Sequence, residues 1–226
     1  MLQAESELMS EALDDVFGWE LLQVGTWGSR EALLAGCRTR RHAVVANRRA
    51  LRGDADIAAR LSQLPIANGA VDAVVLPHTL EFETDPYAVV READRVLAGE
   101  GQLIVLGFRP LSLWGFRSRA ISRGYPPGLK RMLGARRVAD WLELLGYDVS
   151  LTRNYLFTPP WGSTAPRPDV PSALLRRGWL KPWPAGAYLM KARKRVYTLT
   201  PIRPRARQTA QPIGGLAKPT TPRQSN

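Results

Sequence analysis

Cysteine is nearly absent from this 226-residue sequence, in which Cys37 is the sole example. One thiol excludes an internal disulfide and a cysteine-rich metal site, and it fits a reducing, cytoplasmic setting. Uninterrupted runs of about 18 apolar residues are also absent, so we expect no membrane-spanning helix. The first twenty residues contain six acidic side chains and no basic one, which argues against a secretory signal or a transit peptide.

Acidic residues are scarce in the second half of the chain. Sixteen of the twenty lie within residues 1–100, while the whole chain has a formal net charge of +12. The second half is therefore strongly basic, and such a surface attracts nucleic acid, an anionic membrane or an acidic substrate. Codon bias in a GC-rich genome is the alternative explanation, because the chain contains 27 arginines and only five lysines.

Several catalytic patterns are missing as well. The sequence has no cluster of metal ligands, no phosphate-binding glycine loop and no Ser/His/Asp arrangement. It also lacks the pattern Gly-x-Gly-x-x-Gly, and Asn47 stands where dinucleotide-binding enzymes place an acid for the ribose. These absences disfavour a metalloenzyme, a hydrolase of the triad type and a dehydrogenase.

What is present is an alternation of short apolar runs and amphipathic stretches. Nearly continuous apolar runs such as Val71–Leu76 are typical of strands buried on both faces of a parallel sheet. Asp85 and Pro86 open a helix as N-cap and first-turn proline, and Ser29 caps an earlier one. The expected helices span 5–17, 30–34, 86–98 and 136–145, and the expected strands span 20–24, 42–46, 57–61, 71–76, 102–108, 147–157 and 187–196.

This alternation predicts one Rossmann-like α/β domain over residues 1–200. Its sheet is expected to be doubly wound, mostly parallel and seven-stranded, with helices on both faces. A basic insert at 109–135 and a Pro/Trp-rich segment at 158–186 interrupt the pattern. The basic tail at 201–226 has too little apolar surface to order itself, so we expect it to be disordered. Ligands bind such sheets beyond the carboxyl ends of the strands.

Residues 64–108 contain the most specific motif. An ordered series runs through Leu64-Pro65-Ile66, the strand Asp72–Leu76, the segment Pro77-His78-Thr79-Leu80-Glu81-Phe82, the Asp85-Pro86 helix start and the turn Gly99-Glu100-Gly101. This series resembles the class I S-adenosylmethionine (SAM) methyltransferases of the type 11 group. It is similar in particular to a bacterial branch whose fourth strand ends in the letters LPHTLEF. The resemblance covers about residues 15–157 and 185–197.

The resemblance implies SAM as the cofactor and methyl transfer as the activity. In the family, the loop after the first strand reads acid-x-Gly-x-Gly-x-Gly, and further acids bind the ribose and lie near the adenine. This sequence keeps Gly25, but it has Gln23 and Trp27 within that loop, Asn47 at the ribose and Arg60 near the adenine. Each lost charge-assisted hydrogen bond weakens binding by about 1.5–3 kcal/mol, which stacking by Trp27 or Arg60 could offset.

Family roles can be carried over only onto matching positions. The implied cofactor-binding residues are Gln23, Gly25, Thr26, Trp27 and Gly28 for the methionine part, Asn47 for the ribose, Arg60 and Leu61 for the adenine, and Pro77 beside the methyl group. His78 is the candidate catalytic base, because imidazole accepts a proton near neutral pH. A hydrogen-bonded structural histidine is the alternative. Arg109 and Tyr125 are the candidate acceptor-binding residues.

A second hypothesis comes from a different class of function. The chain could be a non-catalytic relative of the same fold that binds nucleic acid or a protein partner through its basic insert and tail. The substitutions at Gln23, Trp27 and Asn47 favour this hypothesis, while the 64–108 motif supports only the fold that both hypotheses share. Nucleic-acid binding would depend steeply on salt. The sequence leaves the methyl acceptor and the oligomeric state open.

Overall fold

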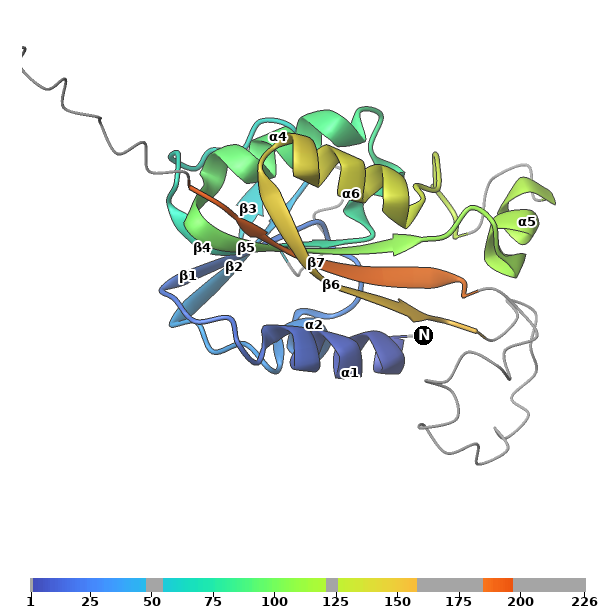
Figure 1. Cartoon of the computed structure of the whole chain (residues 1–226), viewed down its shortest axis with the longest axis horizontal. Coiled ribbons are helices and arrows are strands. Elements are labelled where there is room, and N and C mark those ends of the chain that lie inside the picture. The colour runs from blue at the N-terminus through green and yellow to red at the C-terminus, as the bar shows by residue number, and fades with distance from the viewer. Residues whose placement is uncertain (1, 48–54, 121–125, 158–184, 197–226) are drawn as a thin grey trace, which may run out of the picture. The chain divides into compact units, whose positions relative to one another are not determined.

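A seven-stranded sheet with helices on both faces forms the body of the protein (Figure 1). The computed structural model describes residues 2–47, 55–120, 126–157 and 185–196. The strands are β1 (Glu20–Val24), β2 (Arg41–Ala46), β3 (Ile57–Ala58), β4 (Val71–Pro77), β5 (Leu97–Phe108), β6 (Tyr147–Tyr155) and β7 (Ala187–Lys194). The helices are α1 (Leu2–Leu13), α2 (Arg30–Leu34), α3 (Thr79–Phe82), α4 (Pro86–Val96), α5 (Leu113–Ala120) and α6 (Ala135–Leu144).

The strand order is β3-β2-β1-β4-β5-β7-β6, which confirms the predicted doubly wound sheet. The pairs from β3 through β5 are all parallel, and β7 alone runs antiparallel to both of its neighbours. From β1 the chain adds β2 and β3 on one side, and it then adds β4 on the other side of β1, so the strand order switches between β1 and β4. This arrangement places the segments after β1, β2 and β4 side by side at one edge of the sheet.

Each face of the sheet is covered by its own helices. One face packs against α1 and α2, and the other against α4 and α6 (Figure 1). Along β4, Ala73 and Val75 face the first layer while Val74 and Leu76 face the second, as strand geometry requires. All four are fully buried, which explains why this strand reads as an unbroken apolar run.

Local capping bonds fix where several elements begin. The Asp85 side chain accepts a hydrogen bond from the Ala88 N–H at 3.0 Å, and Ser29 accepts one from Ala32 at 3.2 Å, as both N-caps were predicted. Asp72, at the start of β4, accepts hydrogen bonds from the N–H groups of Trp19 and Glu20. These two bonds tie the start of β1 to its neighbour in the sheet.

Some predicted boundaries were wrong. Helix α1 ends at Leu13, four residues early, so Phe17 is 65% exposed instead of joining the apolar face. Strand β5 begins at Leu97, which pairs with Val71; the register then shifts before Gln102 pairs with Ala73, and Glu100 between them has a positive φ of 65°. Strand β3 is shorter than predicted, and β6 and β7 each end two residues early.

Helix α5 was not predicted within the basic insert. The proline and glycine content of this insert indicates a loop. Ser112 nevertheless provides a helix cap, since its Oγ accepts a hydrogen bond from the Gly115 N–H at 3.1 Å. Residues 48–54, most of the Pro/Trp-rich segment and the tail at 201–226 lie outside the described residues, so the expected disorder of the tail stays a prediction. No helix among the described residues is long and apolar enough to cross a membrane.

Leu142 and Leu144 offer a test of the packing of α6. Leu142 is fully buried, whereas Leu144, two residues later, is 79% exposed. Leu142→Ala should lower the free energy of unfolding by about 2–5 kcal/mol, because it leaves a cavity in the core. Leu144→Ala should change it by less than about 0.5 kcal/mol. Denaturant unfolding of both variants measures the difference, and similar losses would contradict the assigned face of α6.

Candidate functional site

A cavity of about 350 Å³ lies beyond the carboxyl ends of β1, β2 and β4. We call it the central cavity, and it is lined by Gly25, Thr26, Trp27, Asn47, Leu61, Pro77, His78, Thr79, Phe82, Glu83 and Pro127. Seven of these residues were predicted to belong to one site, although they come from four separate segments of the chain. The volume is within the range of about 300–1,000 Å³ that is usual for small-molecule sites.

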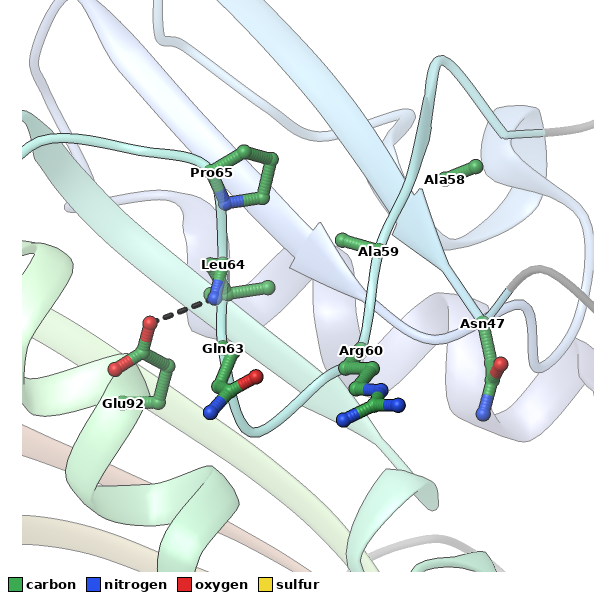
Figure 2. Close-up of a pocket in the computed structure, with 8 residues that line it drawn as sticks. All are labelled: Asn47, Ala58, Ala59, Arg60, Gln63, Leu64, Pro65 and Glu92. Carbon is green, nitrogen blue, oxygen red and sulfur yellow. Dashed lines mark hydrogen bonds between the residues drawn. The ribbon is translucent and has the colours of Figure 1, made fainter.

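A second, more open cavity of about 580 Å³ adjoins the same strand ends (Figure 2). Asn47 lines both cavities, and the outer cavity adds Arg60 and Gln63 from the turn after β3. The side chains of Asn47 and Arg60 point in the same direction in Figure 2. Glu92 of α4 closes one side, where its Oε1 accepts a hydrogen bond from the Leu64 N–H at 2.6 Å.

The turn after β1 packs closely against the start of α3. Gly25 has a positive φ of 99°, a conformation that favours glycine. A Cβ at this position would lie 2.6 Å from Oγ1 of Thr79, whose hydroxyl donates to the Val24 carbonyl. The glycine is therefore required by the neighbouring threonine, and this contact holds the floor of the central cavity in place.

Gln23 lies buried beneath that turn. Its Nε2 donates a hydrogen bond to the Gly25 carbonyl at 3.0 Å, which supports the turn from below. Its Oε1 is buried and has no hydrogen-bond partner among the described residues. A buried acceptor without a donor is costly.

Glu5, Trp27, His78 and Tyr155 form a buried polar group that we call the Glu5 cluster. Oε2 of Glu5 accepts a hydrogen bond from the Trp27 indole at 3.1 Å. Its Oε1 lies 3.3 Å from both Nε2 of His78 and the Tyr155 hydroxyl, which are themselves 3.1 Å apart. Glu5, His78 and Tyr155 are no more than 5% exposed, so water contributes little to these contacts.

The cluster decides the ionisation of its members. Burial acts to raise the pKa of Glu5, but hydrogen bonds from His78, Trp27 and Tyr155 outweigh it and hold that pKa below its ordinary value. Burial and the adjacent Glu5 charge raise the pKa of Tyr155 well above its ordinary value. The cluster therefore contains an ionised carboxylate and a neutral phenol that donates to it.

His78 is held in an unusual conformation between β4 and α3. Its φ is +52°, in the left-handed region that residues other than glycine rarely adopt. Such backbone strain often occurs at functional sites. The imidazole has no exposed surface, and its Nδ1 has no partner among the described residues. In this conformation Nε2 is engaged by the Glu5 cluster and the ring is not open to an acceptor.

Trp27 forms part of the cavity wall and does not fill the cavity. Its indole packs against His78, Phe82 and Phe108 with ring centroids 4.8, 5.8 and 5.7 Å away. The hydrogen bond to Glu5 turns its N–H toward α1. An indole where the family has a glycine is therefore compatible with an open central cavity.

Four predicted residues fall outside this arrangement. The first is Gln23, which is buried beneath the turn after β1 and lines neither cavity. Gly28 lines neither cavity; it has a φ of 71°, and its Cα faces Leu33 of α2. Arg109 donates a hydrogen bond to Asn154 at 3.2 Å and also lines neither cavity. Tyr125 lies outside the described residues.

Sequence reasoning missed Glu5, Thr79 and Tyr155. Glu5 shares a helix face with Met9 and Leu13, both fully buried, so an acid at a core position of α1 was a usable signal. Tyr155 gave no such signal, because it meets Glu5 across 150 positions of sequence. Glu81 is also buried, and its Oε1 accepts a hydrogen bond from the Phe108 N–H at 2.7 Å.

The Glu5 cluster predicts the tautomer of His78. Nε2 faces an ionised carboxylate and a phenol that donates to it, so the proton should reside on Nε2 and leave Nδ1 unprotonated. Nitrogen-15 NMR of histidine-labelled protein would measure this directly, with His42 as the only other histidine. Glu5→Gln should alter the His78 signals, whereas Glu7→Gln, on the exposed side of the same helix, should not. A predominantly Nδ1-protonated His78 would contradict the cluster.

Glu81 predicts a pH dependence of stability. Burial raises the pKa of this carboxyl above its ordinary value of 4.5, so the folded chain binds the proton more tightly than the unfolded chain. Its contribution to stability is therefore largest at acid pH and is lost as pH rises from about 4.5 through the raised folded pKa. Glu81→Gln keeps an acceptor for Phe108 and cannot titrate, so it should gain on the wild type as pH rises, by at most about 1.4 kcal/mol per pH unit.

Urea unfolding between pH 5 and pH 8 would measure this gain. Glu143→Gln, which removes a carboxylate from the exposed surface of α6, controls for the change in net charge. Equal pH profiles for the two variants would show that Glu81 does not hold its proton in the way its burial requires.

Comparison with known proteins agrees with the motif found in the sequence. A family model described as a methyltransferase domain, type 11, matches residues 29–105. The uncharacterized protein YafS of Escherichia coli is 41% identical over 99 residues, which are 43% of this chain and 41% of YafS. An uncharacterized protein of Mycobacterium tuberculosis is 32% identical over 157 residues, which are 66% of this chain and 53% of that protein. The chain thus spans about half or less of these relatives.

Solved structures share the fold. A SAM-dependent methyltransferase from Archaeoglobus fulgidus superposes with a TM-score of 0.60 at 14% identity, covering 85% of this chain and 93% of that one. The family match indicates SAM as the cofactor. The resemblance read from residues 64–108 is confirmed: residues 29–105 match the type 11 methyltransferase domain model, and the chain has the class I SAM-dependent methyltransferase fold.

Proposed function

We propose that the protein is a SAM-dependent methyltransferase whose acceptor is still to be identified. The observation that carries this proposal is the central cavity, which gathers Gly25, Asn47 and Leu61 from three separate strand ends. These are the positions at which the family holds the methionine, ribose and adenine parts. The cavity stays open although Trp27 replaces a glycine at its wall.

The residues present fit the cofactor in shape and in hydrogen bonding. Gly25 and Thr26 would contact the methionine part. Asn47 lies between the two cavities, where it would bind the ribose. Arg60 and Leu61 would flank the adenine.

The chemistry asks little of the protein's side chains. SAM supplies an activated methyl group when bound, and the protein's part is to align an acceptor with it and to exclude water. Pro77 and His78 form the wall beyond β4, and we assign this wall to the methyl-transfer face. The Glu5 cluster would keep Trp27 and His78 fixed there.

Charge at the site favours modest affinity. Gln23 and Asn47 are neutral and Arg60 is cationic, whereas SAM carries a positive sulfonium. Loss of charge-assisted hydrogen bonds at about 1.5–3 kcal/mol each places the expected dissociation constant in the micromolar range, about −8 kcal/mol. Binding too weak to detect would instead favour the non-catalytic hypothesis, which the loss of these acids also supports.

Asn47→Asp tests the assignment of the cavity. A carboxylate accepts hydrogen bonds from both ribose hydroxyls, whereas the amide accepts with one group and donates with the other. The variant should bind SAM about ten-fold more tightly, a gain of about 1.4 kcal/mol. Isothermal titration calorimetry measures the change.

Asn68→Asp is the matched control, since it makes the same charge change in the exposed turn before β4. It should leave SAM affinity unchanged. The proposal would be overturned if the wild-type protein gave no heat of binding with SAM at about a hundred micromolar. Equal effects of the two substitutions would overturn the placement of the ribose at Asn47.

A further inference from the structure

Helix α5 extends beyond the carboxyl end of β5, away from the two helical layers (Figure 1). It is anchored there by Trp114, which is 8% exposed and stacks on Phe108 with ring centroids 6.2 Å apart and an angle of 13° between the planes. Gly115 allows the helix to pack this closely, because a Cβ at that position would lie 2.1 Å from the Pro110 carbonyl oxygen. The helix is therefore fixed to the sheet by its inner side.

The outer side of this segment exposes large apolar side chains. Leu111 is 73% exposed and Phe116 is 61% exposed, within six residues of each other. Arg119 is exposed and Arg117 half-buried on the same helix. Arg117 follows the buried Trp114 by three residues and so shares its inner face, and we call Leu111, Phe116 and Arg119 the α5 surface.

The surroundings of the α5 surface in the sequence are acid-free. No aspartate or glutamate occurs from residue 101 to residue 139, and eight arginines and lysines do. A ligand for this surface must therefore combine negative charge with an apolar phase that accepts leucine and phenylalanine. The interface of an anionic lipid bilayer has both properties.

We propose that the α5 surface docks the protein on anionic lipid membranes. Phe116 and Leu111 would insert at the level of the headgroups, while Arg119 would contact a lipid phosphate. Nucleic acid explains the α5 surface less completely, because a base can stack on Phe116 but offers nothing to a leucine.

The position of this surface connects it to the central cavity. Trp114 stacks on Phe108, and Phe108 in turn packs against Trp27 and His78 of the cavity wall, at 5.7 and 4.0 Å. A membrane docked at α5 would therefore lie at the same end of the sheet as the methyl-transfer face. This assigns a lipid-soluble acceptor to the enzyme, an extension that rests on the proposed function.

Vesicle sedimentation of the full chain tests the docking. The wild type should bind vesicles of phosphatidylglycerol and phosphatidylcholine, and should bind phosphatidylcholine alone much more weakly. The double variant L111S/F116S should lose roughly ten- to hundred-fold in affinity for the anionic vesicles. Calorimetry with SAM on the same protein separates the two proposals, because it measures cofactor binding without any membrane.

The double variant F17S/L144S is the matched control. It also removes one phenylalanine and one leucine that are exposed, by 65% and 79%, but far from α5 in the sequence and on other elements. It retains the α5 surface and the basic tail, so it should bind vesicles within about two-fold of the wild type. If L111S/F116S does not fold, the single substitution Arg119→Glu at an exposed position gives the same test, with an expected loss of several-fold.

Three results would overturn the docking proposal. The first is equal vesicle binding by L111S/F116S and F17S/L144S, which would assign the interaction to another part of the chain. The second is equal binding to anionic and neutral vesicles. The third is binding of a single-stranded RNA oligonucleotide without any binding to vesicles, which would make the surface a nucleic-acid site.

Discussion

The carboxylate of Glu5 is the point on which the site depends. It is fully buried on α1 and joins the turn after β1, the residue after β4 and the end of β6 through Trp27, His78 and Tyr155. A charge removed from water is stable only when donors replace its hydration, and here three do so. Helix α1 is thereby tied to the cavity wall by polar bonds as well as by its apolar face.

This arrangement also explains how an indole can replace a glycine beside the cavity. Trp27 has its N–H committed to Glu5 and its rings packed among His78, Phe82 and Phe108. The side chain is large, but its direction is fixed away from the central space. The altered loop therefore changes the chemistry of the wall, which becomes more aromatic and less acidic, without closing the site.

Local signals in the sequence were enough for most of the fold. Buried parallel strands such as β4 read as apolar runs, and capping residues such as Asp85 mark helix starts, because both effects act within a few residues. The family resemblance assigned Asn47, Leu61 and Pro77 to one site, and topology placed them at strand ends that meet on the same side of the sheet. The Glu5 cluster and the buried state of His78 could not be derived in this way, since they depend on contacts between residues 22 to 150 positions apart. Helix α5 was missed because its cap, Ser112, is surrounded by residues typical of loops.

The position of β7 has a consequence for synthesis of the chain. This strand pairs with β5 on one side and β6 on the other, so the last of the described strands in the sequence lies inside the sheet. Until β7 leaves the ribosome, β5, which ends at Phe108, and β6, which ends at Tyr155, each have an unpaired edge. Unpaired strand edges promote aggregation. At about 5–20 residues per second, the interval between the end of β5 and the start of β7 lasts roughly 4–16 s. The two strands that β7 joins thus remain open to wrong pairing throughout that interval.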